Sequence, residues 1–296
     1  MRHNPPGRLR AEPGLSPEDL LEVEKLAADC VAVDGGRLKL EWGILQSRPP
    51  DQVNDFLWVS SGNLVGFLGL YGYRQDQIEL CGMVGPTARR QGIFSRLFEA
   101  AIDELASRGV PQALLVVDRT YQAGAAFARF VGGSIEHSEH RMTLRREPER
   151  VDPDLLVRLR QAELADAPFV ASCLAEAFAV PIDQLEVEEL DALARRFPGT
   201  LVFDYANEPV GTVRVDRDGD SAGIYGFAVL PRFQGRGIGR KVLTKLTRDL
   251  VAEGMAHVGL EVSCTNDSAL HLYTSCGFDV TGTEDYYAVS LPRPKA

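Results

Sequence analysis

Hydrophobic residues recur at helical spacing in two stretches that lie far apart in the chain. A hydrophobic side chain at every fourth position forms one face of a helix, and a glycine soon after the last of them is typical of a helix C-cap. The pattern therefore predicts two amphipathic helices, which end at Gly109 and Gly254. Their hydrophobic positions are Ile93, Leu97, Ala101 and Leu105 in the first helix and Ile238, Val242, Leu246 and Leu250 in the second.

Short hydrophobic segments flank each helix and predict strands. Two segments precede each helix and are joined by polar or glycine-containing turns, as in an antiparallel pair. One short apolar segment follows, as in a strand that is buried on both faces. A further helix then leads to Gly132 or Gly277 and to a last antiparallel ribbon. The predicted strands are 64–70, 78–84 and 113–117 in the first stretch and 209–215, 224–230 and 258–262 in the second.

The two stretches are copies of one another at a constant separation of 145 residues. Glycines, a proline and the strand alternation all keep this separation without a gap, which is the pattern of an internal repeat. The matching pairs are Val65 and Val210, Gly66 and Gly211, Pro86 and Pro231, Gly92 and Gly237, Ile93 and Ile238, Gly109 and Gly254, Leu115 and Leu260, Val117 and Val262, and Gly132 and Gly277.

A charged segment that contains prolines separates the two copies and predicts the domain boundary. This segment, 145–154, includes Pro148 and Pro153. A chain of 296 residues is long enough for about two cores. We therefore expect an N-terminal domain at residues 1–147 and a C-terminal domain at residues 148–296.

Composition narrows the classes of protein that fit. No apolar run approaches the roughly 18 to 20 residues of a membrane span, and no apolar stretch follows the charged first residues, so we expect a cytoplasmic protein without a membrane partner. Five cysteines without a C-x-x-C pair disfavour a disulfide framework and a zinc site, so no metal is expected. A net charge of −10 disfavours nucleic acid as a partner. The expected oligomeric state is a monomer or a homodimer.

The join between a predicted strand and a predicted helix in the second copy is rich in glycine and arginine. Over residues 227–240 it reads FAVLPRFQGRGIGR. Glycines let backbone N–H groups converge without obstruction by Cβ atoms, and the helix N-terminus adds a positive dipole. Such a cradle suits a pyrophosphate. The spacing differs from that of a P-loop and from that of the dinucleotide-binding fingerprint.

This loop and several later residues resemble the acetyl-CoA signature of the GNAT superfamily of acetyltransferases. The resemblance covers most of residues 155–291 and extends more weakly over about 15–145. It implies an α/β (α+β) protein of two tandem GNAT folds, each a mixed, mostly antiparallel sheet that splays apart and is flanked by helices. The residues that carry the resemblance are Phe227, Ala228, Val229, Gln234, Gly237, Gly239, Asn266, Ala269, Tyr273, Gly277 and Phe278.

The resemblance also implies roles for individual residues and acetyl-CoA as the cosubstrate. Tyr273 matches the general acid that protonates the departing thiolate, which suits a phenol because its pKa lies close to that of a thiol. A core tyrosine packed under the sheet is the structural alternative for it. Asn266 matches a residue that contacts the pantetheine arm, and a helix N-cap is the structural alternative for it. The remaining expected cofactor-binding residues are Phe227, Ala228 and Val229 for the acetyl and pantetheine groups, Gln234, Gly235, Arg236, Gly237, Ile238, Gly239 and Arg240 for the pyrophosphate, and Ala269.

The first copy lacks several of these residues. At the constant separation, Ala128 stands for Tyr273, Phe94 stands for Gly239, and Tyr121 stands for Asn266. Arg89 to Gly92 still offers charge and glycine to a phosphate, so binding of CoA without turnover is one interpretation. We favour the other, in which the N-terminal copy is degenerate and shapes the acceptor cleft.

Neither a general base nor an acceptor site is evident. The resemblance places a glutamate on the strand before the loop, but residues 223–227 contain no carboxylate. Asp216, Asp218 and Asp220 are more typical of a solvated hairpin turn, and His257 and His271 have no catalytic arrangement. The first helices of the module carry acidic residues that either attract a cationic amine or form a solvent face. These acidic residues are Glu176, Asp183, Glu186, Glu188, Glu189 and Asp191.

The function expected from these features is transfer of an acetyl group from acetyl-CoA to a primary amine of a small molecule or a peptide, by direct attack in the C-terminal domain. The alternative from another class is a noncatalytic acyl-CoA sensor or scaffold, because a fold does not guarantee a function. A narrower enzymatic alternative is an acetyltransferase similar to the mycothiol synthases. The missing strand carboxylate places that alternative below a general N-acetyltransferase.

Overall fold

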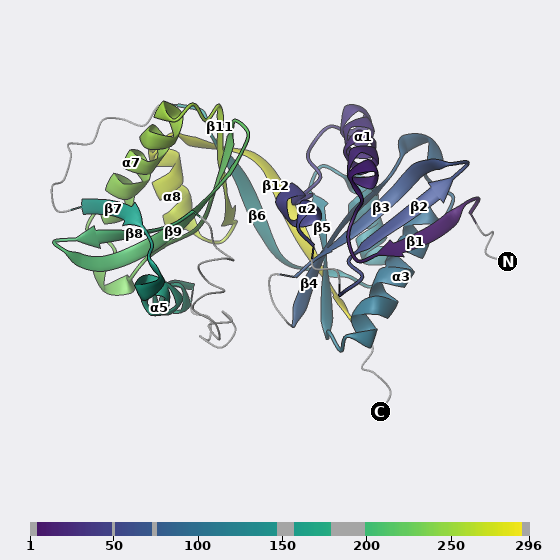
Figure 1. Ribbon diagram of the computed structural model, residues 1–296, viewed down its shortest axis with the longest axis horizontal. Helices are drawn as coiled ribbons and strands as arrows, with labels where there is room; N and C mark the ends of the chain where they lie inside the picture. Colours follow the sequence, from purple (N-terminus) through teal and green to yellow (C-terminus); the bar gives the residue numbers. More distant parts are fainter. Residues whose placement is uncertain (1–4, 49–50, 73–75, 147–156, 179–198, 292–296) are drawn as a thin grey trace. The chain divides into compact units, whose positions relative to one another are not determined.

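The computed structural model describes residues 5–48, 51–72, 76–146, 157–178 and 199–291. The described chain forms two compact units (Figure 1). Unit 1 contains the chain up to Ser138 together with the segment from Glu284 onward, and unit 2 contains Glu139–Thr283. The two units are therefore not separated at a single point in the chain. The expected boundary between residues 147 and 148 lies in a segment outside the described residues and stays a prediction.

Unit 1 is a sheet with helices on both faces, as expected. Its strands lie in the order β1-β2-β3-β4-β5-β12 and are antiparallel except for the pair β4 and β5. The elements are β1 (Arg8–Glu12), α1 (Pro17–Asp34), α2 (Trp42–Gln46), β2 (Asp55–Ser60), β3 (Asn63–Tyr71), β4 (Gln77–Val84), the 3-10 turn η1 (Pro86–Ala88), α3 (Ile93–Ser107), β5 (Gln112–Asp118), α4 (Gln122–Phe130), β6 (Ser134–Leu144) and β12 (Phe278–Ser290).

Unit 2 repeats this arrangement. Its strands lie in the order β6-β11-β10-β9-β8-β7, with β10 and β11 as the parallel pair. The elements are β7 (Val157–Gln161), the 3-10 turn η2 (Leu164–Asp166), α5 (Ala167–Phe178), β8 (Thr200–Tyr205), β9 (Glu208–Asp218), β10 (Ser221–Val229), the 3-10 turn η4 (Pro231–Phe233), α7 (Ile238–Ala252), β11 (His257–Ser263) and α8 (Asp267–Ser275).

The last strands of the two copies are exchanged. The end of β12, Glu284–Ser290, pairs with β5 of unit 1, although it follows unit 2 in the chain. The segment Glu139–Thr143 of β6 pairs with β11 of unit 2, although it follows unit 1 in the chain. Each sheet is thus completed by a strand from the end of the other copy. This exchange explains why no single cut in the chain separates the two units.

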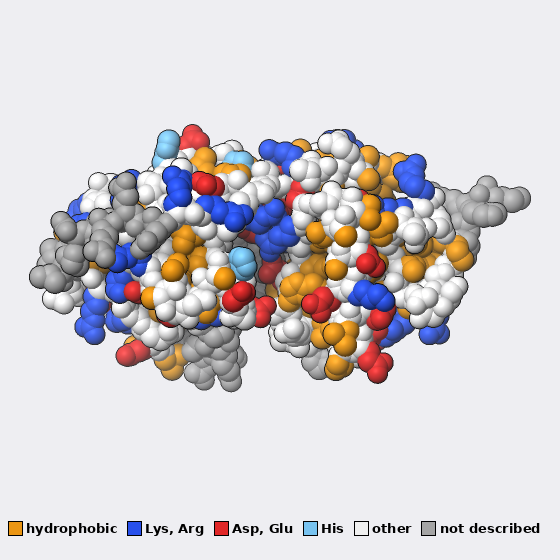
Figure 2. All heavy atoms as spheres, turned by 90° about the horizontal axis from the view of Figure 1, so that it is seen from above, with side chains coloured by type: hydrophobic (Ala, Val, Ile, Leu, Met, Phe, Trp, Pro, Cys, Tyr) orange, Lys and Arg blue, Asp and Glu red, His pale blue; other side chains and the backbone are white. Residues whose placement is uncertain are grey.

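Helices cover each sheet on two faces through separate hydrophobic clusters. In unit 1, α3 and α4 pack against one face through Leu97, Phe98 and Ala128, and α1 and α2 pack against the other. In unit 2, α7 and α8 pack against the face that carries Val213 and Val215. On the face of the molecule shown in Figure 2, charged side chains of both signs lie among small groups of hydrophobic ones. Among the described residues no helix is long and apolar enough to cross a membrane.

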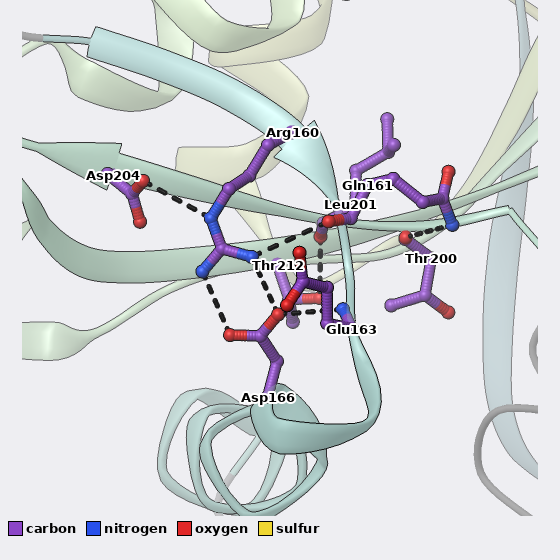
Figure 3. A network of polar contacts seen from close by, with 8 residues as sticks. All are labelled: Arg160, Gln161, Glu163, Asp166, Thr200, Leu201, Asp204 and Thr212. Carbon is purple, nitrogen blue, oxygen red and sulfur yellow. Dashed lines mark hydrogen bonds and ion pairs between the residues drawn. The ribbon is translucent and has the colours of Figure 1, made fainter.

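An arginine on the first strand of each unit is paired with an aspartate at the start of the first helix. In unit 2, Arg160 on β7 donates to both carboxylate oxygens of Asp166, at 2.6 and 2.8 Å, and its Nε contacts Asp204 on β8 at 3.4 Å (Figure 3). In unit 1, Arg10 and Asp19 form the same bidentate pair with two contacts of 2.9 Å. The Arg160 guanidinium holds the pKa of Asp166 below its usual range. These contacts fix the entry to α5.

Replacement of Arg160 with alanine should lower the free energy of unfolding by about 1–3 kcal/mol, because two half-buried carboxylates lose a charged donor. The measurement is urea unfolding of the full chain, followed by circular dichroism. Arg217→Ala is the matched control, since Arg217 pairs with Glu253 at 3.0 Å on an exposed surface, where such pairs contribute about 0–1 kcal/mol. Equal losses in the two variants would contradict a specific anchoring role for Arg160.

Candidate functional site

Strand β10 contains an irregularity at the point where the sheet of unit 2 opens. Its ladder with β9 pairs Tyr225 with Arg214 and then Ala228 with Thr212, so Gly226 and Phe227 lie in a β-bulge. Gly226 has a φ of +54°, which favours glycine. The parallel ladder with β11 ends just before the bulge, at the pair Ile224 and Leu260. Beyond that pair the strands part, which is the splayed sheet that the sequence resemblance implies.

The bulge is absent from unit 1, where β4 pairs with β3 without interruption. Leu80 and Ile224 occupy the same ladder position, opposite Leu70 and Val215, and are 144 residues apart. After the bulge the separation is 145 residues. The ungapped repeat expected from the sequence is therefore wrong by one residue on this strand, because the bulge of unit 2 holds an extra residue.

The glycine loop of unit 2, Gln234–Arg240, forms an exposed cradle at the start of α7. Gly235 and Gly237 have φ angles of +73° and +75°, and a Cβ atom added at either position meets nothing within 4 Å. Gly237 is the N-cap of α7 and supplies no side-chain cap. The first N–H groups of the helix therefore face open space, where an anion can accept from them. Arg236 and Arg240 are exposed beside the loop.

Two predicted loop residues have structural partners. The Nε2 atom of Gln234 donates to the backbone oxygen of Val229 at 2.9 Å, which ties the loop to the end of β10. Ile238 is buried and packs with Val242 in the hydrophobic core, which anchors the first turn of α7. Their contact with a pyrophosphate stays a prediction. Gly239 lies between the strand and α8, with its ideal Cβ position 3.6 Å from Phe227 and 3.5 Å from Leu272.

The predicted acetyl and pantetheine segment follows the bulge. Phe227 packs its ring against Phe203, with centroids 5.8 Å apart, and Ala228 is buried opposite Thr212. Val229 ends the strand beside the loop. Asn266 is the N-cap of α8, since its side-chain oxygen accepts from the backbone N–H of Ala269 at 3.0 Å. The structural alternative for Asn266 is therefore present, and it leaves the predicted pantetheine contact untested.

Tyr273 lies on α8 with only 8% of its surface exposed. Its ring contacts Phe278 edge to face, at 6.3 Å between centroids. Burial, with a smaller contribution from Cys276, raises the pKa of Tyr273 to about 12. The phenol makes no hydrogen bond to any residue that the structure describes, so a ligand can be its partner. A phenol with this pKa keeps its proton throughout the physiological range and can serve as an acid.

The raised pKa of Tyr273 predicts a late spectroscopic titration. The absorbance at 295 nm of wild type minus Tyr273→Phe should show this phenol ionising near pH 12, because burial disfavours the phenolate. An unperturbed tyrosine ionises near pH 10. Tyr205→Phe supplies a matched difference spectrum from another tyrosine of unit 2. A Tyr273 transition at or below pH 10 would contradict the burial of its hydroxyl.

The corresponding loop of unit 1 keeps the backbone conformation and changes the side chains. Arg90 and Gly92 have positive φ angles like those of Gly235 and Gly237. Phe94 occupies the position of Gly239 and stacks edge to face on Phe127, at 4.8 Å between ring centroids. Arg89 is paired with Asp34 through contacts of 2.8 and 2.6 Å. Ala128, which replaces the tyrosine, is fully buried.

A cavity of about 720 Å³ lies in unit 1 beside this altered loop. It is lined by β4, β5, the loop and the start of α4, with Phe94 and Tyr121 in its wall. The Tyr121 hydroxyl donates to the backbone oxygen of Gly35 at the end of α1. Unit 1 thus retains an opening between its splayed strands, but the tyrosine and the last loop glycine are absent.

The structure describes only one of the acidic residues expected on the acceptor side. Glu176 is exposed on α5, and the other acidic residues expected on the acceptor side, Asp183 to Asp191, lie outside the described residues. Among the described residues no group of His, Cys, Asp and Glu is arranged to hold a metal ion. The pairs Arg160–Asp166 and Arg10–Asp19 were not predicted from the sequence. A signal for them exists, since Arg-Leu-Arg occurs at both 8–10 and 158–160, outside the constant separation.

Comparison with known proteins shows the family. The model of the acetyltransferase (GNAT) family matches residues 26–132 and 161–278, once in each copy. A mycothiol acetyltransferase of Rhodococcus jostii is 29% identical over 290 residues, which cover 90% of this chain and 93% of that protein.

Two solved structures share the fold. A GCN5-related N-acetyltransferase from Sphaerobacter thermophilus has a TM-score of 0.80 at 18% identity, with 99% of each chain covered. A tandem GNAT protein from the clavulanic acid biosynthesis pathway has a TM-score of 0.74 at 16% identity, with 97% of this chain and 100% of that chain covered. The chain belongs to the GNAT family of acetyltransferases and contains two GNAT domains in tandem.

Proposed function

We propose that unit 2 transfers an acetyl group from acetyl-CoA to a primary amine of a small molecule or a peptide. The observation that carries this proposal is the bulge at Gly226, which lies where β10 parts from β11 and beside an uncapped helix N-terminus. The parted strand offers unpaired backbone groups to a pantetheine arm, and the loop offers N–H groups to a pyrophosphate. Gly235 and Gly237 leave open space where the phosphates would lie. The residues present therefore fit acetyl-CoA.

The proposed reaction is a direct attack on the thioester. The neutral amine forms a C–N bond with the acetyl carbon, the C–S bond breaks as the thiolate departs, and the nitrogen then releases one proton to solvent. Backbone N–H groups of the bulge would stabilise the negative charge that develops on the acetyl oxygen. Tyr273 would donate its proton to the thiolate. The raised pKa of Tyr273 supports this role because the residue remains protonated at neutral pH.

The acceptor belongs to the same proposal. The Rhodococcus relative, which aligns with 90% of this chain, is named as a mycothiol acetyltransferase. We therefore put mycothiol without its acetyl group first among the amine acceptors. The missing carboxylate at residues 223–227 led the sequence analysis to rank this acceptor lower. The extent of the alignment supports moving it ahead of an unspecified amine.

Unit 1 would be a noncatalytic partner under this proposal. Ala128 has no proton to give, and Phe94 fills the place of a loop glycine. The cavity of unit 1 favours a second candidate function, in which the chain binds an acyl-CoA without turnover. The two candidates differ in whether any amine is acetylated.

The test is incubation of the full chain with acetyl-CoA and each of three amines, with the acetylated amine detected by its mass. The amines are deacetylated mycothiol, glucosamine and a short peptide with a free N-terminus. Detection by mass is necessary because an acceptor that carries a thiol interferes with assays of released CoA thiol. Formation of an N-acetyl product supports the proposal. Binding of acetyl-CoA without product from any of the three would favour the noncatalytic candidate.

A further inference from the structure

The family resemblance implies a glutamate on β10, but the strand has glycine at position 223. The neighbouring strand β9 has a carboxylate beside this position. Asp216 on β9 is directly opposite Gly223 on β10. Residues that are directly opposite in an antiparallel pair project to the same face, with Cβ atoms roughly 5 Å apart. Val213 and Val215, which alternate with Asp216, project to the other face and pack with α7 and α8. Asp216 therefore projects from the face of the sheet on which a side chain at position 223 would lie.

A tyrosine fills the place of a side chain at position 223. A Cβ atom built on Gly223 would lie 2.5 Å from Cε2 of Tyr225 and 2.7 Å from its hydroxyl oxygen. The ring of Tyr225 therefore folds back over Gly223 and excludes any side chain there. This packing explains physically why β10 carries no carboxylate at this position.

An arginine joins the tyrosine to the aspartate. The Arg214 guanidinium lies 4.7 Å from the centroid of the Tyr225 ring and 3.0 Å from Oδ2 of Asp216. The side chains of Arg214, Asp216 and Tyr225 thus form one cluster across two strands, which we call the β9–β10 cluster. Asp216 keeps 44% of its side chain exposed, so it remains open to solvent or a ligand.

We infer that Asp216 accepts the proton that the acceptor ammonium must lose before it attacks acetyl-CoA in unit 2. This inference rests on the proposed function. The ammonium N–H bond breaks, its proton passes to the Asp216 carboxylate, and the nitrogen lone pair forms the bond to the acetyl carbon. The C–S electron pair leaves with sulfur, which takes a proton from Tyr273. Once the C–N bond has formed, the nitrogen loses its second proton to solvent. Solvent also removes the proton from Asp216 and restores the one on Tyr273.

The distance along the strand decides how the proton travels. The bulge begins three residues beyond Gly223, which is roughly 10 Å at about 3.3 Å per residue. A carboxylate at Asp216 therefore reaches the attacking nitrogen through a short chain of water molecules. Such relays are a common form of general base catalysis. We expect a smaller contribution than from a base in direct contact.

Burial and a charged neighbour on the same strand shift the pKa of Asp216. Burial raises the pKa of Asp216, and Arg214 opposes that shift. Among the described residues, Tyr225 on β10 faces it, and Glu261 on β11 and Arg141 on β6 are opposite one another further across the same sheet. A raised pKa makes the carboxylate a better proton acceptor.

The test compares Asp216→Asn, Asp216→Glu and the control Asp218→Asn. Asp218 is exposed two residues further along β9, and its substitution removes the same charge. The measurement is kcat/KM for the best amine of the three above, between pH 6 and pH 10, together with titration of acetyl-CoA. Asp216→Asn should lower kcat/KM about 10- to 100-fold near pH 7. The deficit should shrink as pH rises, because the free amine becomes abundant.

Asp216→Glu should recover most of the activity, and all three variants should bind acetyl-CoA like wild type. A wild-type profile for Asp216→Asn, or a deficit equal at every pH, would overturn the inference and leave the proposed function standing. A pH-independent deficit would instead reflect disturbance of Arg214 and Tyr225. Absence of acetyl transfer by the wild-type protein would overturn both.

Discussion

Replacement of Gly237 with glutamate should abolish acetyl transfer. Gly237 is the N-cap of α7 with a φ of +75°, and open space surrounds its ideal Cβ position. The new carboxylate would therefore project where the phosphates of acetyl-CoA are proposed to bind. Two like charges about 4 Å apart repel by about 4 kcal/mol at an effective dielectric constant near 20. That energy corresponds to roughly a thousand-fold loss in kcat/KM for acetyl-CoA.

The chain supplies two matched controls for this variant. Gly237→Gln has the same size and backbone strain without the charge, so it separates electrostatic repulsion from the cost of a positive φ. Gly92→Glu places the same side chain at the equivalent N-cap of α3, where φ is +86° and space is also open. Activity should survive in Gly92→Glu. Equal loss in Gly92→Glu and Gly237→Glu would contradict the assignment of catalysis to unit 2.

Replacement of Tyr273 with phenylalanine should lower kcat by about 10²- to 10⁴-fold, the usual contribution of a positioned general acid. The ring contact with Phe278 is retained in the variant, and no hydrogen bond to a described residue is lost. We therefore expect KM for acetyl-CoA and the unfolding midpoint to change little. The measurement is steady-state kinetics with the best amine acceptor, together with thermal unfolding.

Tyr205→Phe is the control for loss of a phenol elsewhere in unit 2, since Tyr205 packs in the other hydrophobic cluster of that unit. Its kcat should equal that of wild type. A kcat of Tyr205→Phe below that of Tyr273→Phe would contradict a role for Tyr273 as the general acid. A large rise in KM with an unchanged kcat would assign Tyr273 to binding alone.

Local features of the fold were predictable from sequence because they depend on neighbouring residues. The four-residue spacing after Ile93 and Ile238 fixes the buried faces of α3 and α7, and both helices begin at those residues. The positive φ angles of Gly92 and Gly237 follow from the same glycines that signalled the loop. The tandem arrangement was predictable because the loop and helix recur at constant separation.

Nonlocal features could not be predicted in the same way. The exchange of β6 and β12 depends on which strand edge each segment reaches, and both segments have similar alternating patterns. The bulge at Gly226 shifts the repeat by one residue within β10. The spacing from Gly211 to Gly237 still equals that from Gly66 to Gly92, so the glycine pattern gives no sign of the shift. The sequence analysis interpreted Asp216 as part of a hairpin turn, whereas the turn begins beyond Asp218 and Asp216 lies within β9.

The loops of the two units share a backbone conformation and differ in their side chains. Arg89 and Gln234 both donate to the end of the preceding strand, through Val84 and Val229 respectively, at 2.9 Å in each case. This contact holds the loop whether or not a ligand binds. Among the positions that differ are Phe94 and Ala128, which replace Gly239 and Tyr273.

Isothermal titration of acetyl-CoA into the wild-type protein, Gly92→Glu and Gly237→Glu tests where the cosubstrate binds. We expect wild type and Gly92→Glu to bind acetyl-CoA with the same affinity and Gly237→Glu to lose that binding. Undiminished binding by Gly237→Glu, with loss in Gly92→Glu, would place the acetyl-CoA site in unit 1 and contradict a catalytic unit 2.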